Sequence, residues 1–294
     1  MNLGNTTVME IRQSFLARLK GLYDKEEINS IAYILFEDFL GWPRTKLHLE
    51  AGAVIEPLKA RMFSDALLRL ADGCPVQYIT GKADFNGLSI SVNPSVLIPR
   101  QETAELAFLI ALELKTLEMD DFSAIDVCTG SGCIAIYLKK QFPGISMHAT
   151  DISEDALSTA RANAADNGTN IDFYNTDILN TSGQPSNHRF NLVVSNPPYV
   201  TLREKEAMRI NVKAYEPNTA LFVPDEDPLI FYREISVYSK TRLAEGGLLY
   251  FEINEAFGNE IKELLISCGF SNVVVRKDFG GRDRFIRAEL RSHF

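Results

Sequence analysis

Hydrophobic residues recur at helical spacing over the first part of the chain. In residues 6–23 they lie three or four positions apart, which is the period of an amphipathic helix. Two more segments follow this pattern: 29–41 begins with an asparagine that can cap a helix, and 57–73 begins with proline and ends with glycine. The pattern predicts a small helical bundle over residues 1–82.

The pattern changes after Cys74. Residues 75–98 are rich in β-branched and turn-forming side chains, and Asn86-Gly87 is a dipeptide typical of a tight turn between antiparallel strands. We therefore expect a β-hairpin linker over residues 83–98, between the helical segment and the rest of the chain.

From residue 99 onward, short apolar runs alternate with amphipathic segments. The runs 123–128 and 146–151 have the length of strands, and a helix-like segment follows each of them. Such alternation predicts an α/β fold whose mostly parallel sheet is covered by helices on both faces. Close to the C-terminus, two strand-like segments around Gly280-Gly281 predict an antiparallel hairpin at the edge of this sheet.

The composition is that of an ordinary soluble globular protein. Of the 294 residues, 46% are hydrophobic and 23% are charged. The sequence has no apolar run close to the ~20 residues of a membrane helix, and its first residues lack the features of a signal peptide. We expect a cytoplasmic, monomeric protein without membrane attachment, whose four cysteines are reduced thiols and which holds no metal.

The charge balance bears on the class of partner. The formal net charge is −9, which argues against tight nonspecific binding to nucleic acid, because phosphates must be neutralised by Lys and Arg. Residues 1–84 are closer to neutral, with ten Lys and Arg against eleven Asp and Glu. The N-terminal segment is therefore less acidic than the remainder of the chain.

A glycine-rich turn follows the first strand of the alternating region. Gly130 and Gly132 stand where this strand gives way to a helix, and Asp151 ends the next strand nineteen residues later. Glycines let the backbone approach a ligand, and an acid at a strand end can accept hydrogen bonds from ribose hydroxyls. The spacing also fits a dinucleotide-binding fingerprint, so an NAD enzyme is a competing interpretation, and a tight turn without a ligand is the purely structural one.

Two further acids favour a cofactor without phosphate groups. Asp126 lies four residues before Gly130, where it would repel a pyrophosphate but suits a cationic amino group. Asp177 ends the third strand, where an adenine amino group could bind. S-adenosyl-L-methionine has an amino acid end, a ribose, an adenine and no phosphate, so these acids favour it over NAD.

The sequence Asn196-Pro197-Pro198-Tyr199 ends the fourth strand, on the same edge of the sheet as the glycine-rich turn. A residue before proline is pushed out of the helical region, so this segment is stiff and extended. The Asn196 side-chain oxygen and the Pro197 carbonyl can each accept one N–H of a planar NH2 group, and Tyr199 can pack against its plane. Orienting such a poor nucleophile favours methyl transfer to nitrogen, although a strand-terminating turn also accounts for two prolines.

These motifs resemble those of a known enzyme family. "DVCTGSG" followed by "NPPY" is similar to the amino-methyltransferases that use S-adenosyl-L-methionine. The segments "PVQYITGKADFNGLSISVNPSVLIPRQET", "YEPNTALF", "GGLLYFEIN" and "RKDFGGRDRFI" resemble the PrmC/HemK family of release factor glutamine methyltransferases. The resemblance implies a substrate-docking helical domain (1–82), a hairpin linker (83–98) and a Rossmann-like class I methyltransferase domain (99–294).

The resemblance also implies a reaction and its residues. The methyl group would pass to the side-chain nitrogen (N5) of the glutamine in the Gly-Gly-Gln loop of class I peptide chain release factors, modulating translation termination and leaving S-adenosyl-L-homocysteine. The implied cofactor-binding residues are Cys128, Thr129, Gly130, Ser131, Gly132, Asp151 at the ribose, Asp177 and Ile178 at the adenine, and Asn196. Asn196, Pro197 and Tyr199 would be catalytic, and the four residues Asn196, Pro197, Pro198 and Tyr199 would hold the glutamine amide.

The chain departs from the family pattern at three positions. Cys128 stands where the family usually has glycine, and Gln101 and Ala104 change its "PRPETE" segment to "PRQETA". The tetrad at residues 196–199 does not by itself separate a glutamine amide from a base amine. Methylation of a nucleic acid base is therefore the alternative function, and a cofactor-binding protein without turnover is a third. The small, nearly neutral N-terminal segment favours the protein substrate and no stable nucleic acid binding.

Overall fold

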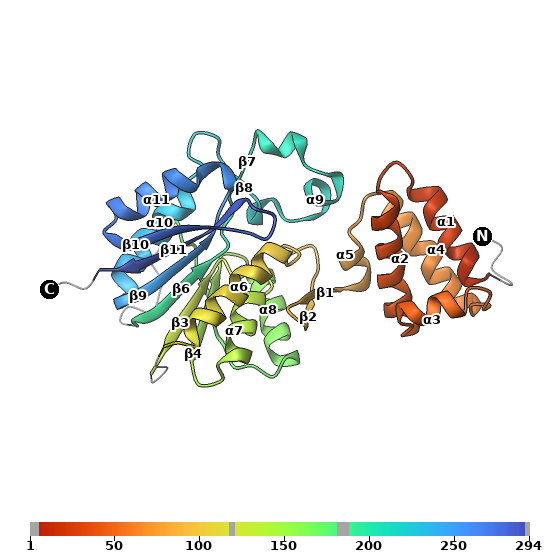
Figure 1. Cartoon of the computed structure of the whole chain (residues 1–294), viewed down its shortest axis with the longest axis horizontal. Coiled ribbons are helices and arrows are strands. Elements are labelled where there is room, and N and C mark those ends of the chain that lie inside the picture. The colour runs from red at the N-terminus through yellow and green to blue at the C-terminus, as the bar shows by residue number, and fades with distance from the viewer. Residues whose placement is uncertain (1–5, 118–120, 181–187, 292–294) are drawn as a thin grey trace. The chain divides into compact units, whose positions relative to one another are not determined.

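The computed structural model describes residues 6–117, 121–180 and 188–291. The chain forms two compact units (Figure 1). One comprises the residues up to Gly81 together with Arg209–Tyr215, and the other comprises Lys82–Met208 and the residues from Glu216 onward.

The first unit is helical, as the sequence pattern predicts. Its helices are α1 (Val8–Leu19), α2 (Lys25–Leu40), α3 (Arg44–Leu49), α4 (Pro57–Ala71), α5 (Val76–Thr80) and α9 (Ile210–Tyr215). The capping of α1 is reciprocal: the Thr7 hydroxyl accepts the Glu10 N–H, and the Glu10 carboxylate accepts the Thr7 N–H. Apolar side chains of α1, α2 and α4 form one core, in which Phe15, Phe36 and Phe63 are fully buried.

The start of α2 differs from the sequence prediction. Helix α2 begins after Asp24, whose carboxylate accepts the Glu27 N–H, so Asn29 lies inside the helix and is not its cap. An acid one turn upstream therefore supplies the N-cap. Helix α5 lies inside the predicted helical range 1–82, although its β-branched residues do not themselves favour a helix; Gly81, in the left-handed region, ends it before the hairpin begins.

Helix α9 follows the tetrad by about ten residues in the sequence yet packs with the first unit. Arg209 forms an ion pair with Glu27, with 3.0 Å between Nη1 and Oε1. The Tyr215 hydroxyl donates a hydrogen bond to the Asp72 carbonyl. The Ile210 side chain lies against Gly73 and occupies the space that a Cβ at position 73 would need.

The second unit is an α/β structure. Its strands are β1 (Lys82–Phe85), β2 (Leu88–Ser91), β3 (Ser123–Val127), β4 (Ser146–Asp151), β5 (Asp172–Asn175), β6 (Phe190–Ser195), β7 (Val200–Thr201), β8 (Phe222–Val223), β9 (Leu243–Glu252), β10 (Phe270–Lys277) and β11 (Asp283–Leu290). Its α-helices are α6 (Gln101–Leu114), α7 (Cys133–Gln141), α8 (Glu154–Asp166), α10 (Ile230–Arg242) and α11 (Gly258–Ser267).

Seven strands form the central sheet in the order β10-β11-β9-β6-β3-β4-β5. Neighbouring strands from β9 to β5 pair in parallel, and β11 pairs antiparallel with both β9 and β10. Helices α6, α7 and α8 cover one face of the sheet, and α10 and α11 cover the other (Figure 1). The predicted α/β fold with an antiparallel C-terminal strand is confirmed.

The strand order places a crevice beside β3. From β3 the chain passes to β4 and β5 on one side, and then returns to β6 on the other. Helices therefore leave the adjacent carboxyl ends of β3 and β6 toward opposite faces, which opens a ligand-binding crevice there. Val127 of β3 is paired with Ser195 of β6, so the glycine-rich turn and the tetrad begin side by side.

The linker hairpin has the predicted turn. Asn86 and Gly87 both have positive φ, 51° and 81°, and join Phe85 to its partner Leu88. The strands end at Ser91, and residues 92–100 continue as irregular chain into α6. Among the described residues, no helix has the length and apolar character needed to cross a membrane.

Candidate active site

A cavity of about 320 Å³ opens at the carboxyl ends of β3, β4 and β6. It has three walls. The first is the turn after β3 with the start of α7, the second comprises the ends of β4 and β5, and the third combines residues 95–99 with the tetrad and residues 219–222. A cavity of this size, mostly apolar with a few convergent polar groups, suits a small organic ligand.

The turn after β3 forms the floor of the cavity. Cys128, Thr129, Gly130 and Ser131 line it. Gly130 has a φ of 56°, and a Cβ at this position would meet nothing within 4 Å, so the space beside it is open. Gly132 instead faces α8, because a Cβ there would lie 3.1 Å from the Cβ of Ala160. Gly130 thus leaves room in the cavity, whereas Gly132 allows two helices to pack closely.

Cys128 adopts a conformation that favours glycine. Its φ is 62°, in the left-handed region that β-carbon-bearing residues rarely occupy. Burial raises the pKa of its thiol well above the ordinary value, and the nearby Asp151 carboxylate acts in the same direction. The side chain therefore lines the cavity as a neutral thiol.

Asp151 connects the second strand to the turn. Its Oδ2 accepts the Gly130 N–H at 2.9 Å, and its Oδ1 accepts the Ser153 N–H at 3.0 Å. Burial raises its pKa, and these two hydrogen bonds oppose the rise. Each carboxylate oxygen keeps a lone pair for a further donor, so Asp151 can accept hydrogen bonds from a ligand's hydroxyls at the cavity wall.

Asp126 is fully buried beneath the turn. The Thr129 hydroxyl donates to its Oδ2 at 2.6 Å, whereas its Oδ1 has no hydrogen-bond partner among the described residues. Burial raises its pKa to about 7, against the opposing effect of the Thr129 hydrogen bond. Asp126 therefore holds the turn through its hydrogen bond with Thr129 and does not line the cavity. The turn would separate its carboxylate from the cationic group that the sequence suggests beside it.

Asp177 and Ile178, for which the sequence suggests an adenine site, follow β5 and line the cavity. The Asp177 Oδ1 accepts the Leu179 N–H at 2.9 Å, which leaves Oδ2 available. Ile152, Ile178 and Leu179, which have apolar side chains, also line the cavity. Apolar lining residues with one free acceptor suit a heteroaromatic ring that carries an amino group.

In the tetrad, Asn196 and Pro198 line the cavity. Both prolines are buried, so the segment is held by packing as well as by its restricted torsions. The Asn196 Nδ2 donates to the Thr103 hydroxyl at 3.0 Å. Tyr199 turns its hydroxyl to Glu252, to which it donates at 2.9 Å, and its ring packs against the sheet core.

Several polar residues outside the set predicted for the site hold it together. Thr103 and Glu252 are buried, and the Thr103 hydroxyl donates to Glu252 at 2.7 Å. Glu216, whose side chain is 1% exposed, accepts the Ile98 N–H and forms a 2.5 Å ion pair with Arg100. These contacts join segments more than a hundred residues apart, which no local pattern reveals. The signal in the sequence is that these residues lie in "PRQET", "YEPNTALF" and "GGLLYFEIN", which resemble the family's motifs.

Two family models match different parts of the chain. The family model "Methyltransferase small domain" matches residues 108–214, and "PrmC N-terminal domain" matches residues 10–81. A release factor glutamine methyltransferase of Flavobacterium psychrophilum is 40% identical over 285 residues, which cover 97% of this chain and 99% of that protein. One of Bacteroides thetaiotaomicron is 40% identical over 284 residues, with coverage of 97% and 99%.

The chain belongs to the release factor glutamine methyltransferase family. It is thereby an S-adenosylmethionine-dependent methyltransferase, and the resemblance inferred from the motifs is confirmed.

Solved structures agree on the fold. The METTL16 methyltransferase domain superposes with a TM-score of 0.51 at 19% identity, covering 81% of this chain and 98% of that one. A methyltransferase from Pyrococcus furiosus gives a TM-score of 0.50 at 20% identity, covering 78% and 100%. At this identity the likeness shows that the second unit has the methyltransferase fold.

The residues present fit S-adenosylmethionine. The open space beside Gly130, the acceptor pair of Asp151, and Asp177 with the apolar lining residues next to it in sequence provide one feature for each part of that molecule. The side chain of Cys128 shares the cavity floor and does not close it, because the space beside the adjoining turn remains open.

Proposed function

We propose that the chain methylates the side-chain amide nitrogen of the glutamine in the Gly-Gly-Gln loop of class I peptide chain release factors. Relatives that match nearly their whole length carry the name release factor glutamine methyltransferase. Within the site, the proposal rests on the orientation of the Asn196 side chain. Its NH2 is engaged by Thr103, so its carbonyl oxygen is available to a planar NH2 group in the cavity.

Cofactor binding is proposed for the residues that line the cavity. S-adenosylmethionine supplies, when bound, an electrophilic methyl group on a cationic sulfur. Asp151 would accept hydrogen bonds from its ribose hydroxyls, and Asp177 with Ile178 would hold the adenine. The backbone of residues 128–131 would lie beneath its amino acid end, and Asn196 would separate it from the protein substrate.

The tetrad orients the nucleophile. An amide nitrogen is weakly nucleophilic because its lone pair is delocalised into the carbonyl. The Asn196 Oδ1 accepts one N–H of the substrate amide and the Pro197 carbonyl accepts the other, so that the face of the nitrogen is directed toward the methyl group. Orientation of this kind lowers the barrier by several kcal/mol. The nitrogen becomes acidic as it is alkylated and then releases a proton, so no strong base is needed before attack.

Transfer of a labelled methyl group tests the proposal. Purified enzyme is incubated with labelled cofactor and, in parallel, with a class I release factor, the same factor with its Gly-Gly-Gln glutamine replaced by alanine, DNA, and ribosomal RNA. Label is expected in the unmodified release factor alone. Label in nucleic acid and not in release factor would support the base-methylating alternative.

We further propose that the helical unit docks the protein substrate, and that the enzyme acts as a cytoplasmic monomer without stable nucleic acid binding. Removal of residues 1–81 should then raise the KM for release factor while cofactor affinity is retained. A truncated protein that binds cofactor and methylates release factor with unchanged KM would exclude the docking role.

A further inference from the structure

A chain of hydrogen bonds leads from the tetrad into the core of the second unit. It runs from the Asn196 Nδ2 to the Thr103 hydroxyl (3.0 Å), and from that hydroxyl to the Glu252 Oε2 (2.7 Å). The Tyr199 hydroxyl donates to the other carboxylate oxygen of Glu252 at 2.9 Å. Thr103 is 3% exposed and Glu252 is 1% exposed, so water does not substitute for these partners.

The direction of each hydrogen bond follows from Glu252. An ionised carboxylate only accepts hydrogen bonds, so the single proton of the Thr103 hydroxyl must point to it. The Thr103 oxygen can then only accept from Asn196, which requires the NH2 group of Asn196 to face it. The alternative rotamer would place the Asn196 carbonyl oxygen against the Thr103 oxygen with no proton between them. The Asn196 Oδ1 is thereby turned away from Thr103.

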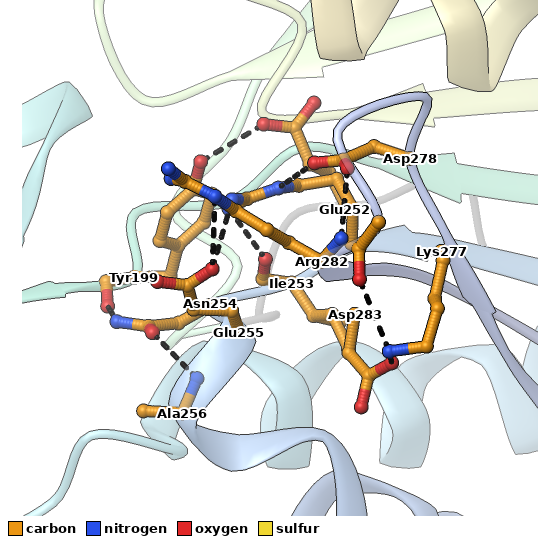
Figure 2. A network of polar contacts seen from close by, with 12 residues as sticks. Tyr199, Glu252, Ile253, Asn254, Glu255, Ala256, Lys277, Asp278, Arg282 and Asp283 are labelled. Carbon is orange, nitrogen blue, oxygen red and sulfur yellow. Dashed lines mark hydrogen bonds and ion pairs between the residues drawn. The ribbon is translucent and has the colours of Figure 1, made fainter.

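Basic and hydroxyl groups around Glu252 favour its ionised form. The Arg284 guanidinium lies nearby and is held by Asp278 at 3.3 Å and by the Ile253 carbonyl at 3.2 Å. Figure 2 shows the Tyr199 hydroxyl joined to the Glu252 carboxylate by a dashed line, with Asp278 in the same polar network. Burial raises the pKa of Glu252, and Glu102 acts in the same direction, while Thr103, Tyr199 and Arg284 oppose the rise.

We propose that Glu252, acting through Thr103, is a positioning residue that holds Asn196 with its carbonyl oxygen toward the amide to be methylated. The proposal rests on the proposed function, because it assigns Asn196 the role of acceptor for the substrate NH2. Neither Glu252 nor Thr103 would touch the reacting atoms; both act through Asn196. Their effect is to make one of the two amide orientations of Asn196 the stable one.

Glu252→Gln tests the direction of the chain. A glutamine of the same shape can donate its NH2 to Thr103, which frees the Thr103 proton to bind the Asn196 carbonyl oxygen. We expect kcat to fall about 10- to 100-fold, as for a misoriented reacting group, with cofactor Kd within about 2-fold of wild type. Glu113→Gln is the matched control. Like Glu252, Glu113 accepts a hydrogen bond from a tyrosine hydroxyl, that of Tyr250, and it also pairs with Arg287. It lies near the end of α6, whereas Thr103 lies near the start of that helix.

Thr103→Val and Thr103→Ser test the link itself. Valine keeps the volume and removes the hydroxyl, and should lower kcat as much as Glu252→Gln does; serine keeps the hydroxyl and should restore most of the activity. Equal activity of the valine and serine variants, or kcat of Glu252→Gln within about 2-fold of the Glu113→Gln control, would overturn the proposal. These two substitutions decide the question even if Glu252→Gln does not fold.

An NMR measurement that needs no turnover distinguishes a failure of this proposal from a failure of the proposed function. The side-chain NH2 resonances of Asn196, assigned by their loss in Asn196→Ala, should be protected from solvent exchange in wild type and Thr103→Ser and unprotected in Thr103→Val. If wild-type enzyme fails to methylate release factor, the proposed function fails, and the NMR comparison still judges the positioning. Identical protection in the valine and serine variants would refute it.

Discussion

Glu216 holds two segments of the third cavity wall together, and its replacement should loosen that wall. Its carboxylate binds the Ile98 N–H at 3.1 Å and the Arg100 guanidinium at 2.5 Å, which connects residues 95–99 to the segment before residues 219–222. Glu216→Gln keeps the shape and removes the charge. A hydrogen bond to a charged group contributes roughly 1.5–3 kcal/mol. Arg100 is one-third exposed and regains solvation in part, so we expect a net loss of about 2 kcal/mol.

This loss can be measured as a melting temperature. For a unit of about 200 residues, each kcal/mol shifts Tm by about 2–4 °C, so Glu216→Gln should lower Tm by about 4–8 °C. Calorimetry should also show weaker cofactor binding, because the third cavity wall is less well held.

Glu154→Gln is the control for Glu216→Gln. Glu154 pairs with Arg161 at 2.6 Å, but the two side chains are 63% and 43% exposed. Such surface pairs contribute about 0–1 kcal/mol. Equal Tm shifts in the two variants, or unchanged cofactor affinity in Glu216→Gln, would refute this account of the cavity wall.

Three further predictions concern individual acids and the tetrad. Asn196→Ala should lower kcat by at least about 100-fold while calorimetry shows most of the cofactor affinity retained, and near-normal turnover would remove Asn196 from the amide site. Asp151→Ala should weaken cofactor binding by about 10-fold or more, measured by the same titration, and an unchanged Kd would exclude its ribose contact. Burial raises the pKa of Asp126 from 3.8 to about 7, so the folded chain binds more protons than the unfolded chain between these values and stability falls as the pH rises through them. Asp126→Asn should flatten this fall when Tm is followed from about pH 4 to about pH 7; an unchanged slope would contradict the burial effect.

The sheet could be predicted because its strands are short apolar runs that alternate with helix-like segments. The run 146–151 coincides with β4, and the pair of strands around Gly280-Gly281 is β10 and β11. The location of the cavity could be predicted for a related reason. Parallel strands end on one edge of a sheet, so residues that follow different strands, such as Gly130, Asp151 and Asn196, come together without any long-range information.

The supports of the site could not be predicted in this way. Thr103 and Glu252 are 149 residues apart and meet only in the folded chain. Both lie in segments that resemble the family's motifs, but no local pattern shows that the two side chains contact each other. The same holds for α9, whose preceding residue Arg209 pairs with Glu27 and whose last residue Tyr215 binds the Asp72 carbonyl. Helix α5 shows the reverse case, because its β-branched residues favour a strand and tertiary packing makes them helical.

Mass spectrometry of a release factor peptide tests the proposed reaction most directly. Release factor is purified from cells with and without this enzyme, digested, and the peptide that contains the Gly-Gly-Gln sequence is fragmented. The glutamine should carry one additional methyl group only when the enzyme is present, and the enzyme with Asn196→Ala should leave it unmodified. An unmodified glutamine in cells that contain the active enzyme would contradict the proposed function.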